Sequence, residues 1–476
     1  MNSIAVKSRF APSPTGRIHL GNCRTALFNH LFAANQNGSF LLRIEDTDVA
    51  RSTKEHAHAL MEDFRWLDLL WQEGAEVGGE LGPYWQSERS AIYQTYYDRL
   101  IESNRAYPCF CTEAELAIRR KLQLSAGKPP RYAGTCRQLS AAQIAEKKQS
   151  GLKPALRFRM QDDEVIEFTD LVKGSQRYLA SEIGDFIIRR ADGGASFMFC
   201  NAIDDSLMCV THAIRGEDHL TNTPRQIAIL NALKMPVPIY GHISLILGQD
   251  GAPLSKRNGS LSVQELREQG YLPIAVLNYL ARLGHYYEAT ELMTHAQLAA
   301  HFATEHLSHS PARFDPQQLL HWQKSAMQQL DLHALKDLLP AEVCAQVPVA
   351  KLDAFIQLVK PNLVFPVEAK HWAELLLADH LNYGAESLAV LQATPAVVFD
   401  AALAALDQHG QNFAALADHV KQTANVKGKA LFQPLRVALT GELHGPEMAG
   451  VAEFLGVDMM RQRFSAARDQ ANKNER

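Results

Sequence analysis

The sequence predicts an α/β protein in which a parallel sheet is followed by an all-α region. Three observations support this fold class. The first ~250 residues alternate short β-rich runs with helical stretches, as parallel sheets do. A polar stretch rich in Lys and Arg, about residues 105–180, interrupts this alternation and indicates an inserted subdomain. From about Gln264 onward, strand signals vanish, and Ala and Leu recur at helical spacing.

The first alternation begins with a strand at Ser8–Ala11 and continues into a helix over residues 23–34. A helix is expected because the apolar residues of this segment recur every three or four positions and share one face. The pair Asn37-Gly38 ends the helix, since glycine readily adopts the left-handed conformation common after helices. Residues 39–46, SFLLRIED, then form the next strand.

A second alternation follows the insert. Met208–Ile214 is predicted to be a strand, and Thr223-Pro224 begins a helix that runs to about Leu233. Proline suits the first helical turn, because the N–H that it lacks would have no partner there. Ile239–Leu247 is predicted to be the next strand, closed by a turn at residues 248–251, GQDG.

Composition and charge exclude several classes of protein. The chain has 476 residues, enough for roughly three domains, and its 48 Lys+Arg and 52 Asp+Glu give a formal charge of −4. No apolar run approaches the roughly 18 residues that span a bilayer, so a membrane protein is excluded. The N-terminus lacks a signal peptide and the 7 cysteines are scattered, which predicts reduced thiols and a cytoplasmic location. Any nucleic-acid-binding surface must be local, since the total charge is near neutral.

Two short segments carry most of the chemistry. The first, residues 9–22 (RFAPSPTGRIHLGN), lies where a strand meets a helix. His19 can donate a hydrogen bond to a phosphate oxygen, Gly21 permits close approach of the backbone, and a helix N-terminus favours negative charge. Alone, this segment could equally be a strand–helix turn with a surface histidine.

The second segment, residues 252–260 (APLSKRNGS), follows the last predicted strand. Ser255, Lys256 and Arg257 lie in a loop flanked by glycine, where a mobile ammonium could reach a polyphosphate. Nucleotidyl transfer depends mostly on positioning and on neutralising charge that develops on the phosphates. Alone, this segment would be interpreted as a solvated basic loop.

Together, PSPTG-x-x-H-x-G and LSKR resemble the two signature motifs of class I aminoacyl-tRNA synthetases. Four stretches are similar to the glutamyl-tRNA synthetase family: RFAPSPTG, LRIEDTD (42–48), VTHAIRGEDHLTNTPRQ (210–226) and KGKALFQPLRVALTG (427–441). The resemblance runs from about Arg9 to Arg463. It implies a Rossmann-like catalytic domain with a parallel sheet, split by an inserted acceptor-binding subdomain and followed by an all-α anticodon-binding region.

The resemblance also implies a division into five segments. They are the two halves of the catalytic domain (1–104 and 191–260), an insert that binds the acceptor end (105–190), a helical stem-contact region (261–325) and a helical anticodon-binding region (326–476). The implied partners are glutamate tRNA and L-glutamate, and the implied state is a monomer. The sequence leaves open whether glutamine tRNA is also charged.

By resemblance, the glutamate pocket is built by the first strand, the RIED strand and the strand before the second helix. Its residues are Arg9, Ala11, Ser13, Glu45, Phe197 and Arg215. Arg9 would bind the side-chain carboxylate, because an arginine fork suits bidentate recognition of a carboxylate, and Glu45 would bind the substrate ammonium. Arg215 matches a second arginine of the family's pocket.

ATP and Mg²⁺ are the implied cofactors. The ATP-binding residues would be His19, Gly21, Ser255, Lys256 and Arg257. Of these, His19 and Lys256 would stabilise the phosphates and are the expected catalytic residues.

The chain departs from the family at three positions. Pro253 stands before LSKR where a lysine is usual, Asn22 replaces a histidine, and Phe197 stands where tyrosine is common. The lost tyrosine hydroxyl can change affinity and specificity in a polar pocket.

The cysteines of the insert indicate a structural zinc site. Cys109 and Cys111 form C-x-C, and Tyr132 and Cys136 form Y-x-x-x-C, which matches a related tRNA-modifying branch. Many bacterial relatives carry Cys-x-His instead, where this chain has Gln138, a poor ligand. Three thiolates and a fourth ligand suit tetrahedral zinc. The alternative is a set of three buried, reduced cysteines.

The implied function is ATP-dependent ligation of L-glutamate to the 3′ end of tRNA through a glutamyl-adenylate, the activity of a glutamate–tRNA ligase. Glutamylation of a modified tRNA base by a shorter relative is one alternative, but it leaves the C-terminal third unused. The others are a non-catalytic tRNA-binding paralogue and a nucleotidylyltransferase for a small cofactor. Retention of Arg9, Glu45, Arg215, His19 and Lys256 argues against loss of catalysis.

Overall fold

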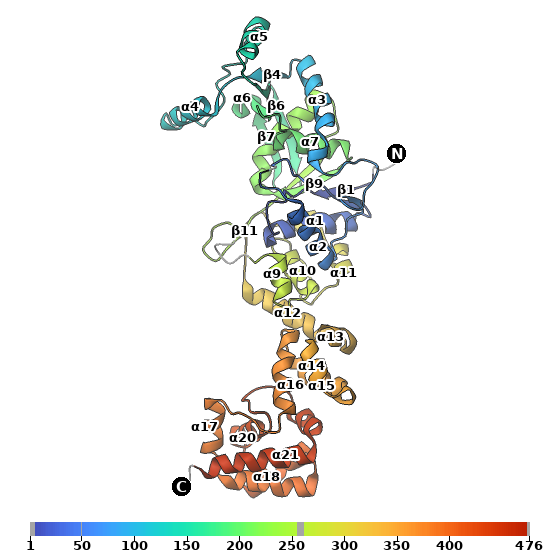
Figure 1. Cartoon of the computed structure of the whole chain (residues 1–476), viewed down its shortest axis with the longest axis vertical. Coiled ribbons are helices and arrows are strands. Elements are labelled where there is room, and N and C mark those ends of the chain that lie inside the picture. Colours follow the sequence, from blue (N-terminus) through green and yellow to red (C-terminus); the bar gives the residue numbers. More distant parts are fainter. Residues whose placement is uncertain (1–4, 49, 255–260, 474–476) are drawn as a thin grey trace. The chain divides into compact units, whose positions relative to one another are not determined.

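The structure, a computed structural model, describes residues 5–48, 50–254 and 261–473. The chain divides into two compact units: unit 1 comprises residues 1–269 and 273–318, and unit 2 comprises residues 270–272 and 319–476. Figure 1 shows the helices and strands with the labels used below. The predicted ATP-binding residues Ser255, Lys256 and Arg257 lie outside the described residues.

A five-stranded parallel sheet forms the centre of unit 1. Its order is β10-β9-β1-β2-β3, where β1 is Lys7–Phe10, β2 Ser39–Leu42, β3 Glu73–Gly74, β9 His212–Gly216 and β10 Ile239–Ile243. The strand order reverses between β1 and β9, and ligands of open parallel sheets bind at the carboxyl ends of the strands beside such a reversal. The predicted parallel α/β fold is confirmed.

The helices that flank this sheet follow the predicted periodicity. The predicted helix over 23–34 is α1, Leu20–Asn35, which packs against β1 and fully buries Cys23, Leu27 and Leu31. The helix predicted from Thr223 to Leu233 is α8, Thr223–Leu233. Three further helices before β9 are α2 (Lys54–Trp66), α3 (Ser90–Glu102) and α7 (Phe197–Leu207).

The strand predicted at Met208–Ile214 is wrong at its start. Met208 directly follows α7 and is fully buried against Leu41 and Tyr84, and Cys209 turns the chain with a φ of +55°. The strand β9 therefore begins only at His212. The hydrophobic residues before β9 belong to a buried turn. In the sequence, the apolar residues of such a turn cannot be distinguished from those of a strand.

The strand predicted at Ile239–Leu247 is divided in two. Its first part is β10, and its second part is β11, Ile246–Leu247, which pairs in a separate sheet with β12, Ala312–Arg313. A short strand therefore occurs after Gln264, contrary to the prediction. The strand predicted over 39–46 is shorter in the structure, where β2 ends at Leu42. The chain beyond β2 still bonds to the chain that follows β1, because the Glu45 N–H donates to the Pro12 carbonyl at 2.9 Å.

Antiparallel strands occupy the region between α3 and α7. One sheet has the order β4-β5-β8 (Ala106–Cys109, Ala155–Phe158 and Phe186–Arg189), and β6 (Val165–Asp170) forms a hairpin with β7 (Gly174–Leu179). Helices α4 (Glu113–Ser125) and α5 (Ala141–Gln149) bury none of their residues. The hairpin adjoins the parallel sheet, because the Leu171 N–H donates to the Tyr240 carbonyl at 2.9 Å.

Unit 2 is helical, as predicted. The boundary between the units falls inside α12, Pro316–Gln329. The α-helices that follow are α13 Leu332–Leu338, α14 Ala341–Gln346, α15 Leu352–Val359, α16 Ala369–Leu377, α17 Ala385–Ala393, α18 Ala396–His409, α19 Phe413–Thr423, α20 Lys429–Thr440 and α21 Met448–Asn472. Their core includes Phe355, Phe399 and Phe464, all fully buried.

Among the described residues, no single helix has the length and apolar composition needed to cross a membrane. One pair, α17 and α18, meets both criteria only when its two helices are taken together, and the pair is bent by 87°.

Candidate active site at the strand-order reversal

A cavity of about 460 Å³ opens beside β1 and β9, where the strand order reverses. Every described residue that the sequence predicted for glutamate or ATP lines it: Arg9, Ala11, Ser13, His19, Gly21, Glu45, Phe197 and Arg215. These residues come from four separate stretches of the chain. Asn22 and Pro253, two of the departures from the family pattern, line the same cavity.

The first helix begins at the cavity wall. His19 is the residue before α1 and has an extended backbone, with φ −97° and ψ 163°, and its carbonyl accepts a hydrogen bond from the Cys23 N–H at 3.0 Å. A Cβ added at Gly21 would come within 3.1 Å of the His19 imidazole. Gly21 therefore leaves the imidazole room beside the helix N-terminus, whose N–H groups favour an anion.

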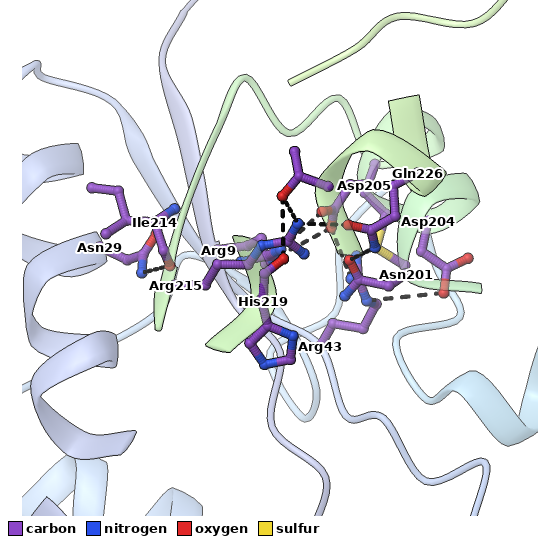
Figure 2. Close-up of polar contacts among 12 residues, drawn as sticks. Arg9, Asn29, Arg43, Asn201, Asp204, Asp205, Ile214, Arg215, His219 and Gln226 are labelled. Carbon is purple, nitrogen blue, oxygen red and sulfur yellow. Dashed lines mark hydrogen bonds and ion pairs between the residues drawn. The ribbon is translucent and has the colours of Figure 1, made fainter. Parts of the chain in front are cut away.

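Arg9 reaches the cavity from β1 and is only 4% exposed. Its Nε donates to Asp205 Oδ1 at 3.1 Å and its Nη2 donates to Asp205 Oδ2 at 2.9 Å (Figure 2). Arg43 Nη2 lies 2.7 Å from the same Asp205 Oδ1. Burial alone would raise the pKa of Asp205, but Arg9 and Arg43 outweigh it and hold the pKa below its ordinary value. Asp205 is therefore ionised and fixes both arginines.

Glu45 follows β2 and presents its carboxylate to the cavity. Its Oε1 accepts hydrogen bonds from Asn201 Nδ2 at 2.6 Å, Arg43 Nη2 at 3.1 Å and Gln86 Nε2 at 3.4 Å. Among the described residues, Oε2 has no such donor. Burial raises the pKa of Glu45, against the lowering effect of Arg43. One oxygen is therefore held by the protein and the other is available to a cationic ligand.

Arg215 lies on β9 and is held along one edge of its guanidinium. Nη2 donates to Gln226 Oε1 at 2.6 Å (Figure 2) and to Thr223 Oγ1 at 2.7 Å. Nε lies 3.2 Å from His242 Nε2. The remaining nitrogen, Nη1, is buried without a hydrogen-bond partner among the described residues. Burial lowers the pKa of Arg215 to about 10, which leaves it charged at neutral pH. A buried unpaired N–H of this kind favours an anionic ligand.

Two aromatic rings close one side of the cavity. Phe197, the first residue of α7, lies 5.2 Å from the ring of His219, measured between ring centroids. Burial, with the nearby charge of Arg215, lowers the pKa of His219 to about 4, so its ring is neutral at pH 7. His219 was not predicted as a site residue, although it lies inside a quoted motif.

A buried polar cluster behind the cavity was also missed by sequence reasoning. Asp204 accepts hydrogen bonds from Arg89 Nε at 2.7 Å, Tyr93 Oη at 2.7 Å and Gln86 Nε2 at 2.9 Å. Figure 2 shows Asp204 beside Asn201 and Arg43. Two adjacent aspartates within an apolar run, FCNAIDDSL, were the available signal, because such charges are rarely buried unless they are paired.

The predicted metal-binding residues lie together in the antiparallel region. The Sγ atoms of Cys109, Cys111 and Cys136 lie within 4.8 Å of one another. The Tyr132 hydroxyl lies 3.4 Å from Cys109 Sγ and 3.6 Å from Cys111 Sγ. Sulfur atoms that share a tetrahedral zinc at about 2.3 Å lie about 3.8 Å apart, and Cys111 Sγ and Cys136 Sγ are separated by 3.7 Å. The donor set therefore fits zinc.

Comparisons with known proteins show which family the chain resembles. Residues 5–321 match the catalytic domain of tRNA synthetases class I (E and Q), and residues 333–468 match an anticodon binding domain. The Coxiella burnetii glutamate–tRNA ligase 2 is 54% identical over 462 residues, 97% of this chain and 99% of that protein. A Nitrosococcus oceani glutamate–tRNA ligase 2 is 54% identical over 471 residues, 99% of this chain and 100% of that protein.

A solved structure is similar over nearly the whole chain. The crystal structure of a glutamate tRNA ligase from Elizabethkingia meningosepticum, in complex with its amino acid, matches with a TM-score of 0.88 at 27% identity and covers 98% of this chain and 99% of that one. The chain, with its parallel α/β unit and helical second unit, belongs to the class I tRNA synthetase family of the glutamate and glutamine (E and Q) enzymes.

Proposed function

We propose that the protein ligates L-glutamate to the 3′ end of tRNA in an ATP-dependent reaction. The observation that carries this proposal is the set of charges at the cavity. Among the described residues, Nη1 of Arg9 and Nη1 of Arg215 have no hydrogen-bond partner, which leaves them for an anion. Within the same residues Oε2 of Glu45 has no donor, which leaves it for a cation. Glutamate carries the complementary set, two carboxylates and one ammonium. Arg9 binds the side-chain carboxylate and Glu45 the ammonium in this proposal.

The reaction proceeds in two steps. The α-carboxylate of glutamate attacks the α-phosphate of ATP and releases pyrophosphate. A hydroxyl of the terminal tRNA ribose then attacks the carbonyl of the glutamyl-adenylate, forms the ester and releases AMP. His19 and Gly21 bind the phosphates at the N-terminus of α1, together with Ser255, Lys256 and Arg257. Mg²⁺, when bound, neutralises charge on the phosphates. His19 and Lys256 are the proposed catalytic residues.

The rest of the chain is assigned to the tRNA. Residues 105–190 bind its acceptor end, 261–325 contact its stem and 326–476 bind the anticodon, where unstacked bases can be recognised by stacking and by hydrogen bonds to their edges. The segments 1–104 and 191–260 form the catalytic domain. Cys109, Cys111, Tyr132 and Cys136 hold a structural zinc ion. A monomeric state and a cytoplasmic location belong to the same proposal.

Charging of purified transcripts tests the function and its specificity. The protein is incubated with ATP, Mg²⁺ and labelled glutamate, and with transcripts of glutamate tRNA or glutamine tRNA in separate reactions. Acid-precipitable glutamate on the glutamate tRNA is expected. Charging of the glutamine tRNA as well would identify a non-discriminating enzyme, and charging of neither transcript would contradict the proposal in favour of a non-catalytic tRNA-binding protein.

A further inference from the structure

A chain of buried polar groups leads from the hairpin β6–β7 to Arg215. Strands β9 and β10 are paired in register so that His242 lies directly beside Arg215, and paired residues of neighbouring strands point to the same face. His242 is fully buried. Its Nδ1 lies 2.5 Å from Asp170 Oδ2, and its Nε2 lies 3.2 Å from Arg215 Nε. Asp170, His242 and Arg215 are therefore joined end to end.

The carboxylate of Asp170 is fully engaged by this arrangement. Its Oδ1 accepts hydrogen bonds from three backbone N–H groups, those of Lys173 at 2.8 Å, Val172 at 2.9 Å and His242 at 3.1 Å. Its Oδ2 faces the His242 ring. Asp170 is 2% exposed, and its hydrogen bonds to His242 and the backbone outweigh burial and lower its pKa. The carboxylate is ionised and can only accept hydrogen bonds.

This fixes the position of the proton on His242. Because Asp170 only accepts, Nδ1 carries the proton, and burial keeps the pKa of His242 low enough for a neutral ring. The lone pair of Nε2 then accepts from the Nε–H of Arg215. His242 Nε2 also lies 2.9 Å from Thr223 Oγ1, which accepts from Arg215 Nη2. In the opposite tautomer the Nε2–H would donate to that hydroxyl oxygen, and the hydrogen bond from Arg215 Nε would be lost.

We propose that Asp170 and His242 are positioning residues that orient Arg215 toward the carboxylate of the amino-acid substrate. This inference rests on the proposed function, because it takes Arg215 to be a substrate-binding residue. With Nε and Nη2 held by His242, Thr223 and Gln226, Nη1 is the nitrogen directed to the ligand. Neither Asp170 nor His242 is among the residues that line the cavity, so both act through Arg215.

The substitution Asp170→Asn tests the tautomer directly. The three backbone N–H groups keep the amide oxygen at the position of Oδ1, so the amide N–H₂ faces Nδ1 and drives the proton of His242 to Nε2. The KM for glutamate is expected to rise roughly 10- to 100-fold, the range for a lost hydrogen bond to a charged group, while the KM for ATP stays within about twofold of wild type. His242→Phe, which keeps a flat ring but removes the acceptor, should give the same pattern.

Two controls separate positioning from folding. His212→Phe changes a half-buried histidine on β9 that does not line the cavity, and should leave both KM values unchanged. The ¹⁵N NMR spectrum of the wild-type chain should show a neutral His242 with its proton on Nδ1, whether or not the variants fold. A neutral ring protonated on Nε2, or a charged ring at pH 7, would overturn the inference.

The kinetic outcomes also distinguish the inference from the proposed function. If Arg215→Ala raises the KM for glutamate but folded Asp170→Asn and His242→Phe proteins behave as wild type, the positioning role is wrong and the pocket stands. If Arg215→Ala itself leaves the KM for glutamate unchanged, the proposed pocket is wrong and the positioning role is wrong as well. A parallel rise in the KM values for glutamate and ATP would indicate general distortion and would also contradict the positioning role.

Discussion

Asp205 holds one edge of Arg9 through two hydrogen bonds, from Nε at 3.1 Å and from Nη2 at 2.9 Å. A guanidinium has a second edge, Nη1 and Nη2, that can also bind a carboxylate. That edge is the one left for a ligand. Since Asp205 lies on α7 and Arg9 on β1, the helix orients the arginine before a substrate arrives, which is the arrangement expected of a rigid recognition site.

The substitution Asp205→Asn should weaken both the fold and the pocket. It leaves Arg9 and Arg43 buried with one counter-charge fewer, and breaking a buried ion pair costs about 3–5 kcal/mol. Urea unfolding should therefore show a stability loss of that order, with a raised KM for glutamate in whatever protein stays folded. The exposed control Asp98→Asn should match wild type in both measurements. Wild-type stability in the Asp205→Asn protein would contradict a structural role for this pair.

Arg9 should decide between glutamate and glutamine. Glutamine would place an amide N–H₂ against a guanidinium that offers only N–H groups, and such a mismatch of buried polar groups costs roughly 10⁴-fold in specificity. Pyrophosphate exchange, measured with tRNA present, should therefore depend on glutamate and hardly respond to glutamine. Arg9→Ala should abolish exchange, and Arg9→Lys should restore it poorly because an ammonium lacks the planar fork. Equal exchange with both amino acids would refute the assignment of Arg9.

The short motifs made most of the pocket predictable. Arg9, His19 and Gly21 lie within one 14-residue segment, and Glu45 and Arg215 lie in two further motifs. The family resemblance therefore predicted one pocket for all five, and all five line the cavity. The start of helix α8 was predictable because Pro224 suits the first helical turn. Local patterns of this kind are informative because a few neighbouring residues determine the backbone.

The groups behind the pocket were not predictable in the same way. Asp170 and His242 are separated by 72 residues and meet only because a hairpin loop adjoins strand β10. Asp205 is 196 residues from Arg9. No local pattern encodes such pairings, since they depend on strand order and register. The prediction of where β9 begins was wrong for a related reason, because the apolar residues of a buried turn resemble those of a strand.

The basic motif LSKR should be tested by Lys256→Ala. This residue lies outside the described part of the chain, so the prediction rests on the LSKR motif alone. Removing a positioned charge that stabilises the transition state costs on the order of 10²–10³-fold in turnover. Aminoacylation should slow by that factor, while tRNA affinity, measured by filter binding, stays close to wild type. Near-normal turnover would remove Lys256 from the catalytic residues.

Acid should destabilise unit 1 through buried histidines. His285 is 4% exposed, and burial lowers its pKa to about 4. At a pH between about 4 and the ordinary histidine pKa near 6.5, His285 binds a proton in the unfolded chain but not in the folded chain. The free energy of unfolding therefore falls as pH falls, by up to about 1.4 kcal/mol per pH unit for this site.

The substitution His285→Phe isolates this contribution. Phenylalanine can keep the ring stacking on Phe302, whose centroid lies 4.7 Å away, but binds no proton. Urea unfolding from pH 7 to 4 should show a shallower pH dependence than wild type, even if the variant is less stable at pH 7. The exposed control His309→Phe should keep the wild-type slope. An unchanged slope in His285→Phe would mean that this histidine titrates normally in the folded chain.

The cysteine cluster predicts about one zinc ion per chain. Three Sγ atoms within 4.8 Å of one another, with a tyrosine hydroxyl beside them, provide the four donors that a tetrahedral zinc site requires. Cys111→Ser should lose the metal and weaken binding of an acceptor-arm minihelix, because the metal then no longer cross-links the end of β4 to the segment that carries Tyr132 and Cys136. Cys209→Ser, which changes an exposed cysteine outside the cluster, should retain both zinc and minihelix binding. If metal analysis finds no zinc in chelator-free protein, the cluster is a set of three reduced thiols packed together. Minihelix binding is then expected to be insensitive to Cys111→Ser.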